Sequence, residues 1–163
     1  MQLNPLRHAE RVTGRRQSAL IDLWSTAGFA AAVSEVTGPH LYDYGELPVP
    51  TVAITLYDVR RHVLIEDGTV RRDAPVSAGR FRIGQPGCSV VVDAVPEVRS
   101  GQLLLLYLGD ALLKEVAASR GSAAPVTLTN QAWDTEDPML EAAAKRLVES
   151  CGGGDRPSRL LAE

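Results

Sequence analysis

The sequence has few aromatic residues and only two cysteines. Two Trp, four Tyr and two Phe make up 5% of the 163 residues, so Trp24 and Trp133 are each expected to act as packing anchors. Cys88 and Cys151 lie far apart and form no Cys-x-x-Cys motif, which leaves little basis for a disulfide scaffold or a zinc site. Both are therefore expected to be reduced structural thiols.

Long apolar segments are also missing. The longest run, Leu103 to Leu108, is far shorter than the roughly 20 residues that cross a bilayer. The N-terminus has no apolar signal segment ahead of a small-residue cleavage site. We therefore expect a cytoplasmic protein without membrane contact.

The chain lacks an excess of positive charge. Its 17 Lys and Arg stand against 20 Asp and Glu, for a net charge of −3. Affinity for phosphate groups comes chiefly from clustered Lys and Arg, so the chain as a whole is not expected to be a nucleic-acid-binding surface. Any role at DNA would be indirect.

Motifs for metal binding and nucleophilic catalysis are absent from the sequence. His8, His40 and His62 are widely spaced and form neither His-x-His nor His-x-x-x-His, so each is expected to be a surface or hydrogen-bonded histidine. There is no Gly-x-Ser-x-Gly elbow around a serine nucleophile. These absences predict a protein that holds no metal or cofactor and is not an enzyme.

Two weaker candidates for chemistry have simpler explanations. Gly79, Gly84 and Gly87 surround a predicted strand without the Lys-Ser/Thr of a phosphate-binding loop, so they are expected to be turn glycines. Glu66 and Asp67 are adjacent carboxylates, but consecutive strand residues point to opposite faces. They are expected to form a solvated hairpin tip.

What the sequence does contain is the composition of one globular domain, with 45% hydrophobic and 23% charged residues. Residues 1–40 are expected to be an N-terminal arm and a lead-in segment. The arm, residues 1–16, contains four arginines, Arg7, Arg11, Arg15 and Arg16, and a single acidic residue. Such an excess of positive charge favours contact with solvent, so the arm is predicted to be exposed. Ser18 to Val36 fits either a helix followed by a strand or two short strands.

Residues 41–109 predict an all-β unit of five to seven short strands. Val52, Ile54 and Leu56 alternate with other residues at period two, and Asp67-Gly68 supplies the positive φ of a tight hairpin turn. The predicted strands are Thr51–Arg60, His62–Glu66, Thr69–Asp73, Arg80–Ile83, Ser89–Ala94 and Gln102–Leu108.

Residues 110–163 change to helical periodicity. A first helix is expected to begin at Asp110 as its cap and to end at Gly121. Its buried face would be formed by Leu112, Leu113, Val116 and Ala117.

A second helix is expected after Asp137 as cap and Pro138 as first residue. Glycines 152–154 would break it, and a further helical pattern follows at residues 156–163. The apolar face of this helix comprises Leu140, Ala143, Ala144, Leu147 and Cys151. The fold class predicted from these segments is α+β, mainly β.

The order of these features resembles the sensor half of AraC-family transcription regulators. The resemblance lies in a β-rich middle, the Leu108-Gly-Asp-Ala-Leu-Leu start of a helix, Asp137-Pro-Met-Leu-Glu, and the turn-rich Gly79–Gly87 segment. Arg80 departs from the acid usual there, and the closing Leu160-Leu-Ala-Glu163 is similar to the start of the linker helix. The motifs are loose patterns of turns and apolar positions, covering roughly residues 40 to 163.

This resemblance implies a small cupin-like, jelly-roll barrel that senses a small-molecule effector and forms a homodimer through its C-terminal helices. The histidine and glutamate ligands of enzymatic cupins have no counterpart, so the implied barrel is metal-free. DNA would be contacted only by a helix-turn-helix part outside this chain. The alternative is a stand-alone, metal-free cupin-like binding protein or enzyme, and continuation of the reading frame past Glu163 would separate the two.

Two sets of residues follow as candidate sites. One strand face is expected to line an effector pocket, although the sequence hardly distinguishes the two faces: Val52, Ile54, Leu56, His62, Leu64, Phe81, Ile83, Val90 and Tyr107. The broad apolar stripe of the second helix is expected to form the dimer interface: Met139, Leu140, Ala143, Ala144, Leu147 and Val148.

Overall fold

A computed structural model describes residues 5, 7, 8, 10, 18–124, 126–129 and 131–152, without the side chains of residues 18–20, 131–134, 151 and 152. The predictions for Arg11, Arg15 and Arg16, for the side chains of Trp133 and Cys151, and for the tail at 153–163 lie outside the described part.

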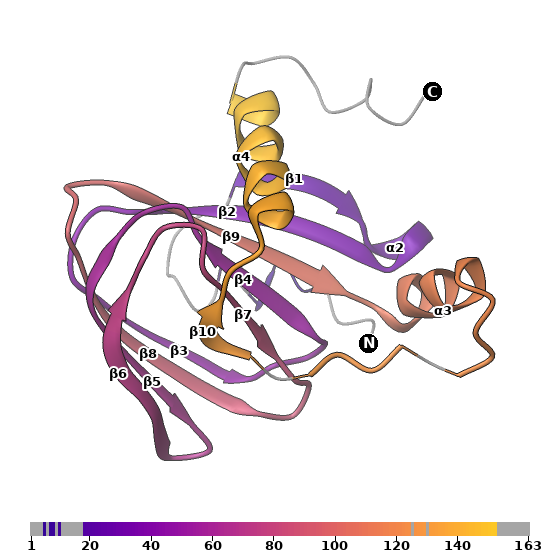
Figure 1. Cartoon of the computed structure of the whole chain (residues 1–163), viewed down its shortest axis with the longest axis horizontal. Coiled ribbons are helices and arrows are strands. Elements are labelled where there is room, and N and C mark those ends of the chain that lie inside the picture. Colours follow the sequence, from indigo (N-terminus) through magenta and orange to yellow (C-terminus); the bar gives the residue numbers. More distant parts are fainter. Residues whose placement is uncertain are drawn as a thin grey trace.

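Two antiparallel sheets face each other and form the body of the protein (Figure 1). The six-stranded sheet has the order β1 (Ser18–Leu23), β2 (Phe29–Val36), β9 (Gly101–Leu108), β4 (Thr51–Thr55), β7 (Phe81–Gly84) and β10 (Gln131–Thr135). The four-stranded sheet has the order β3 (His40–Glu46), β8 (Ser89–Pro96), β5 (Val59–Glu66) and β6 (Thr69–Val76). The predicted α+β, mainly-β class is confirmed.

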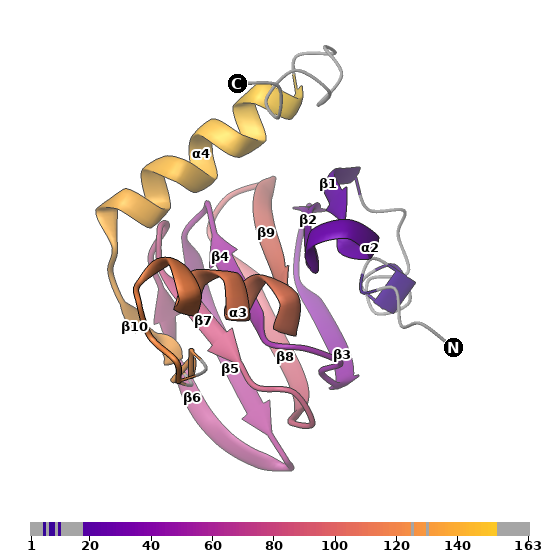
Figure 2. The ribbon, with the colours of Figure 1, turned by 90° about the vertical axis from the view of Figure 1, so that its right-hand side faces the viewer.

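Three helices accompany the sheets: α2 (Trp24–Ala27), α3 (Asp110–Ser119) and α4 (Pro138–Gly152). Figure 2 shows α4 crossing above the six-stranded sheet, with α3 at the end of the barrel where α2 also lies. The start of α3 is tied to the turn after α2, because the Gly109 amide donates to the Gly28 carbonyl at 2.6 Å. None of the described helices is long and apolar enough to cross a membrane.

The core consists of two layers, separated by the six-stranded sheet. Side chains alternate along a strand, so Ala53 and its cross-strand neighbour Leu105 point between the sheets, whereas Ile54 and Leu104 point outward. The outward layer is covered by α4, through the buried side chains of Ala144 and Val148. Both faces of this sheet are therefore buried.

Turn and cap signals in the sequence identified the local geometry correctly. Asp67 and Gly68 have φ of 49° and 75° and join β5 to β6. The Asp137 carboxylate accepts the amides of Met139 and Leu140 at 3.0 Å, which caps α4. Gly121, with φ of 67°, ends the turn after α3.

The prediction that Asp110 caps α3 is wrong. Gly109 is the N-cap and forms no side-chain hydrogen bond. Asp110 is already in the first turn, where its negative charge interacts favourably with the positive end of the helix dipole. Of the predicted buried face only Ala117 is buried, and the other three residues are half-buried.

The N-terminal boundary drawn at residue 40 also needs correction. β2 pairs with β9 along its full length, so the lead-in segment supplies two strands of the six-stranded sheet. Pro5 and His8 of the predicted exposed arm are buried, whereas Arg7 is exposed. Of the two alternatives for residues 18–36, the one with two strands is correct. Strand β10 was not predicted and pairs with β7 at the other edge of the same sheet. Trp24 packs against the interior core as predicted, and Cys88 is a free thiol.

Candidate functional site

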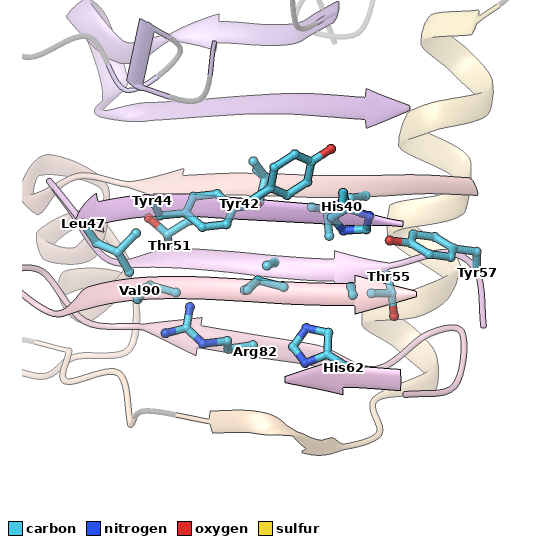
Figure 3. A pocket seen from close by; sticks show the side chains of 15 residues that line it. His40, Tyr42, Tyr44, Leu47, Thr51, Thr55, Tyr57, His62, Arg82 and Val90 are labelled. Carbon is cyan, nitrogen blue, oxygen red and sulfur yellow. The ribbon is translucent and has the colours of Figure 1, made fainter. Parts of the chain in front are cut away.

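A small cavity lies between the two sheets, at the centre of the barrel (Figure 3). It offers about 30 Å³ to the centres of water molecules, which is room for about two of them. Its lining combines aromatic, polar and small apolar side chains from both sheets: His40, Tyr42, Tyr44, Leu47, Thr51, Ala53, Thr55, Tyr57, His62, Arg82, Val90, Val92, Ala94, Leu103 and Leu105.

Strand alternation explains why the cavity exists. Thr51, Ala53 and Thr55 of β4 all point inward and are short, so the middle strand of the six-stranded sheet leaves space that longer side chains would fill. Ala94 plays the same part on β8. The inward face of β4 is thus small and partly polar, while its outward face is large and apolar.

A buried ion pair joins the two sheets beside the cavity. Arg82 of β7 donates through Nη2 to Glu66 Oε1 of β5, and both side chains are almost fully buried. The exposed Arg71 places its Nε 3.7 Å from the other carboxylate oxygen of Glu66. Burying two charges is costly, and their attraction and hydrogen bonding offset that cost only when both partners are present.

His62 of β5 lines the cavity and is 2% exposed. Burial disfavours its charged form and lowers its pKa to about 4, and electrostatic interactions with Arg72, His40 and Arg82 act in the same direction. The imidazole is therefore neutral at physiological pH. In that state one ring nitrogen donates a hydrogen bond and the other accepts one.

All four tyrosines of the chain point into the barrel. Tyr42 packs edge-on against Tyr44, with 6.0 Å between ring centroids, and its ring is tilted by 37° against that of His40 at 4.4 Å. Burial raises the pKa of Tyr44, Tyr57 and Tyr107, so these three keep their protons and remain hydrogen-bond donors. The buried Tyr107 hydroxyl has no hydrogen-bond partner among the described residues.

Tyr57 forms the wall between the cavity and the outside. Its side chain lines the cavity and also a surface cleft of about 530 Å³ at the end of the barrel. Figure 3 shows its hydroxyl pointing inward, on the side of His40. The ring lies directly over Gly101, where a Cβ atom would collide with it. Glycine at this position lets Tyr57 close the barrel.

The structure separates the predicted pocket residues into three groups. His62 and Val90 line the cavity, and Leu64 and Tyr107 belong to the interior core without lining it. The prediction of an inward position is wrong for the other five, which lie on the outward face of the six-stranded sheet, in the layer that α4 covers: Val52, Ile54, Leu56, Phe81 and Ile83.

The physical reason for this error is that both faces of β4 and β7 are buried. Where one face is solvated, the apolar set marks the interior, but here α4 covers the second face. The larger apolar side chains pack under α4, and the smaller and polar ones, such as Ala53 and Arg82, point into the barrel. Glu66, expected at a solvated tip, is buried for a different reason: it faces Arg82 of the other sheet and pairs with it.

The predicted dimer stripe is largely occupied within the chain. Ala144 and Val148 are buried, and Leu140 and Leu147 pack partly against the same layer. Ala144 and Val148 are therefore not available to a partner as predicted, whereas Leu140 and Leu147 are only partly covered. Met139, 84% exposed, and Ala143 remain on the surface.

No group of three or more metal-ligating side chains occurs among the residues that the structure describes. The cavity instead offers imidazole, hydroxyl and guanidinium groups around a small apolar space, which suits hydrogen bonding to a small polar molecule. Most of these groups were missed from the sequence, because it was not predicted that the side chains of Tyr42, Tyr44 and Arg82 point inward. The Tyr-x-Tyr alternation at 42–44 was the available signal.

Comparison by sequence finds no matching protein-family model and no matching curated protein. Comparison by structure finds ToxT from Vibrio cholerae, an AraC-family protein, with a TM-score of 0.54 and 8% identity over 73% of this chain and 47% of ToxT. An apo ToxT variant gives a TM-score of 0.52 and 9% identity over 74% and 47% of the two chains. The chain thus spans about half of ToxT.

A cupin 2 conserved barrel domain protein from Salinispora arenicola is also similar, with a TM-score of 0.44 and 20% identity over 73% of this chain and 98% of that one. At such low identities the likeness concerns the fold alone. The chain has a small cupin-like β fold.

Proposed function

We propose that this chain is the effector-sensing and dimerisation part of an AraC-type transcription regulator, whose DNA-binding part lies outside it. The observation that carries the proposal is the cavity between the sheets, where hydrogen-bonding groups gather in a space that packing alone would fill with apolar side chains. The fold shared with ToxT supports it.

The arrangement suits binding better than turnover. The lining supplies donors and acceptors around an enclosed apolar space, and its one charged residue, Arg82, is paired with Glu66 beside the cavity. A specific observation favours the second candidate, a stand-alone metal-free enzyme: the strongly lowered pKa of His62, since such shifts also mark catalytic bases. Product formation from a bound compound would distinguish that function from sensing.

Effector binding is tested with a cavity-filling substitution. A thermal-shift screen of small acids, alcohols and amides should find a compound that, at 100 times its Kd, adds about 2.7 kcal/mol and raises Tm by roughly 5–10 °C. Ala53→Val should abolish this shift, because Ala53 lines the cavity. Val52→Ile, on the opposite face of the same strand, should retain it. A shift that survives Ala53→Val would place the ligand elsewhere and contradict the proposal.

Self-association is tested at the surface that α4 leaves free. We expect a dimer in sedimentation across a concentration series, and Met139→Glu with Ala143→Arg should weaken it by about tenfold or more. Val70→Glu, which removes another exposed apolar side chain on β6, is the matched control and should have no effect. A strict monomer at high concentration would remove dimerisation from the proposed function.

A further inference from the structure

The charges around the cavity are unbalanced. Arg82 and Glu66 are the buried charged residues among those that the structure describes. Arg71 also approaches Glu66, and Arg72 of β6 lies close enough to His62 to lower its pKa. Arg82 and Arg72 therefore act on the cavity against one buried carboxylate, whereas the half-exposed Arg71 is screened by solvent. An enclosed site with such an excess attracts an anion and disfavours a cation.

Other acids on these strands do not correct the imbalance. Asp73 and Asp93 both lie near Arg61, at 3.7 Å and 3.6 Å, where all three side chains are about half exposed. These carboxylates are screened by solvent and by their own arginine. They leave the positive potential inside the barrel in place.

One hydrogen-bond donor of Arg82 is available to a ligand. Nη2 donates to Glu66, whereas the buried Nε has no hydrogen-bond partner among the described residues. Figure 3 shows the guanidinium rising from its strand into the space between the sheets. An unpartnered N–H of a buried cation costs free energy, which an acceptor placed beside it would recover.

Tyr44 supplies a second donor near the same place. Its hydroxyl lines the cavity, stays protonated at neutral pH, and is close enough to Arg82 for that charge to act on its pKa. Charge-assisted hydrogen bonds from a guanidinium and a hydroxyl are the usual partners of a carboxylate. The neutral imidazole of His62 also lines the cavity, on the same sheet as Tyr44 and across from Arg82.

We propose that the cavity binds the carboxylate group of a small organic acid, which accepts hydrogen bonds from Arg82 Nε and from the Tyr44 hydroxyl. This assignment rests on the proposed function, since it names the class of effector that the barrel senses. The space for about two water molecules fits an acid of the size of formate, acetate or propionate. Tyr57, which closes the barrel, limits the length of the acid.

The test uses sodium formate, acetate and propionate, with the corresponding amides as uncharged isosteres and sodium chloride as a plain anion. Binding is followed by NMR through the methyl groups of Ala53 and Ala94, which line the cavity. The acids should saturate with a Kd of roughly 0.1–10 mM, as ligands of three to five heavy atoms permit. The amides should bind at least about tenfold more weakly.

Three variants separate the proposed donors from a general effect. Tyr44→Phe removes one hydroxyl and should weaken binding of the acids about tenfold, with little change for the amides. Tyr107→Phe makes the same change at a buried tyrosine that does not line the cavity and should leave the affinity unaltered. Arg82→Met combined with Glu66→Leu removes both charges and should abolish acid binding.

Each outcome decides the assignment. Amides that bind as tightly as acids, chloride that displaces acetate at equal concentration, or an affinity unaffected by Tyr44→Phe would overturn it. Neutral compounds whose binding requires Ala53 would support effector sensing but would overturn the assignment of an organic acid as the effector. If neither these acids nor the broader screen produces a ligand, the proposed function itself fails.

Discussion

Replacing Glu66 with leucine is expected to lower the free energy of unfolding by about 3–5 kcal/mol, because it leaves the buried Arg82 without its counter-charge. Arg82 and Glu66 are 4% and 5% exposed, so water cannot solvate the remaining guanidinium. Urea unfolding, followed by far-ultraviolet circular dichroism, gives the change. Asp73→Leu removes a half-exposed partner of Arg61 and should cost less than about 1 kcal/mol.

The double variant Glu66→Leu, Arg82→Met tests the cause of this loss. Two apolar side chains of similar volume remove both charges, so most of the stability lost in Glu66→Leu should return, leaving the double variant within about 1–2 kcal/mol of the wild type. Two losses that simply add would show that Glu66 contributes through packing and not through the ion pair.

Local signals in the sequence were sufficient for most of the secondary structure. A hairpin turn at Asp67-Gly68 and a cap at Asp137 depend on neighbouring residues only, so sequence alone predicts them. Strands β4 to β9 were predicted, whereas β3 was missed and β4 was predicted to extend to Arg60 although it ends at Thr55. The ends of strands were less well predicted, since β6 continues through Pro75 to Val76, which an edge strand permits.

The site could not be predicted from the same signals, because it depends on which element covers which face. α4 lies more than 80 residues after β4 in the sequence, yet it buries the outward face of that strand through Ala144 and Val148. Only this long-range contact reverses the usual assignment of large apolar side chains to the interior. β10 likewise joins its sheet through a partner, β7, that is distant in sequence.

Stability should also depend on pH through His62, over a range where few other side chains titrate. Its pKa is about 4 in the folded protein, against an ordinary value of 6.5 that applies when the chain is unfolded. Between these values the unfolded chain binds the extra proton and the folded one does not. The free energy of unfolding therefore falls as pH decreases from about 6.5 towards 4, by up to about 3 kcal/mol.

Urea midpoints measured from pH 7.5 to pH 4 should show this decline in the wild type and a smaller one in His62→Gln, which has no proton to bind. Carboxylates titrate in both proteins, so the difference between the two curves isolates the histidine. An NMR titration of the imidazole should independently give a midpoint near 4. Parallel curves, or a midpoint near 6.5, would mean that His62 is solvated in the folded barrel. A neutral imidazole held among Arg72, His40 and Arg82 would then no longer be part of the binding site.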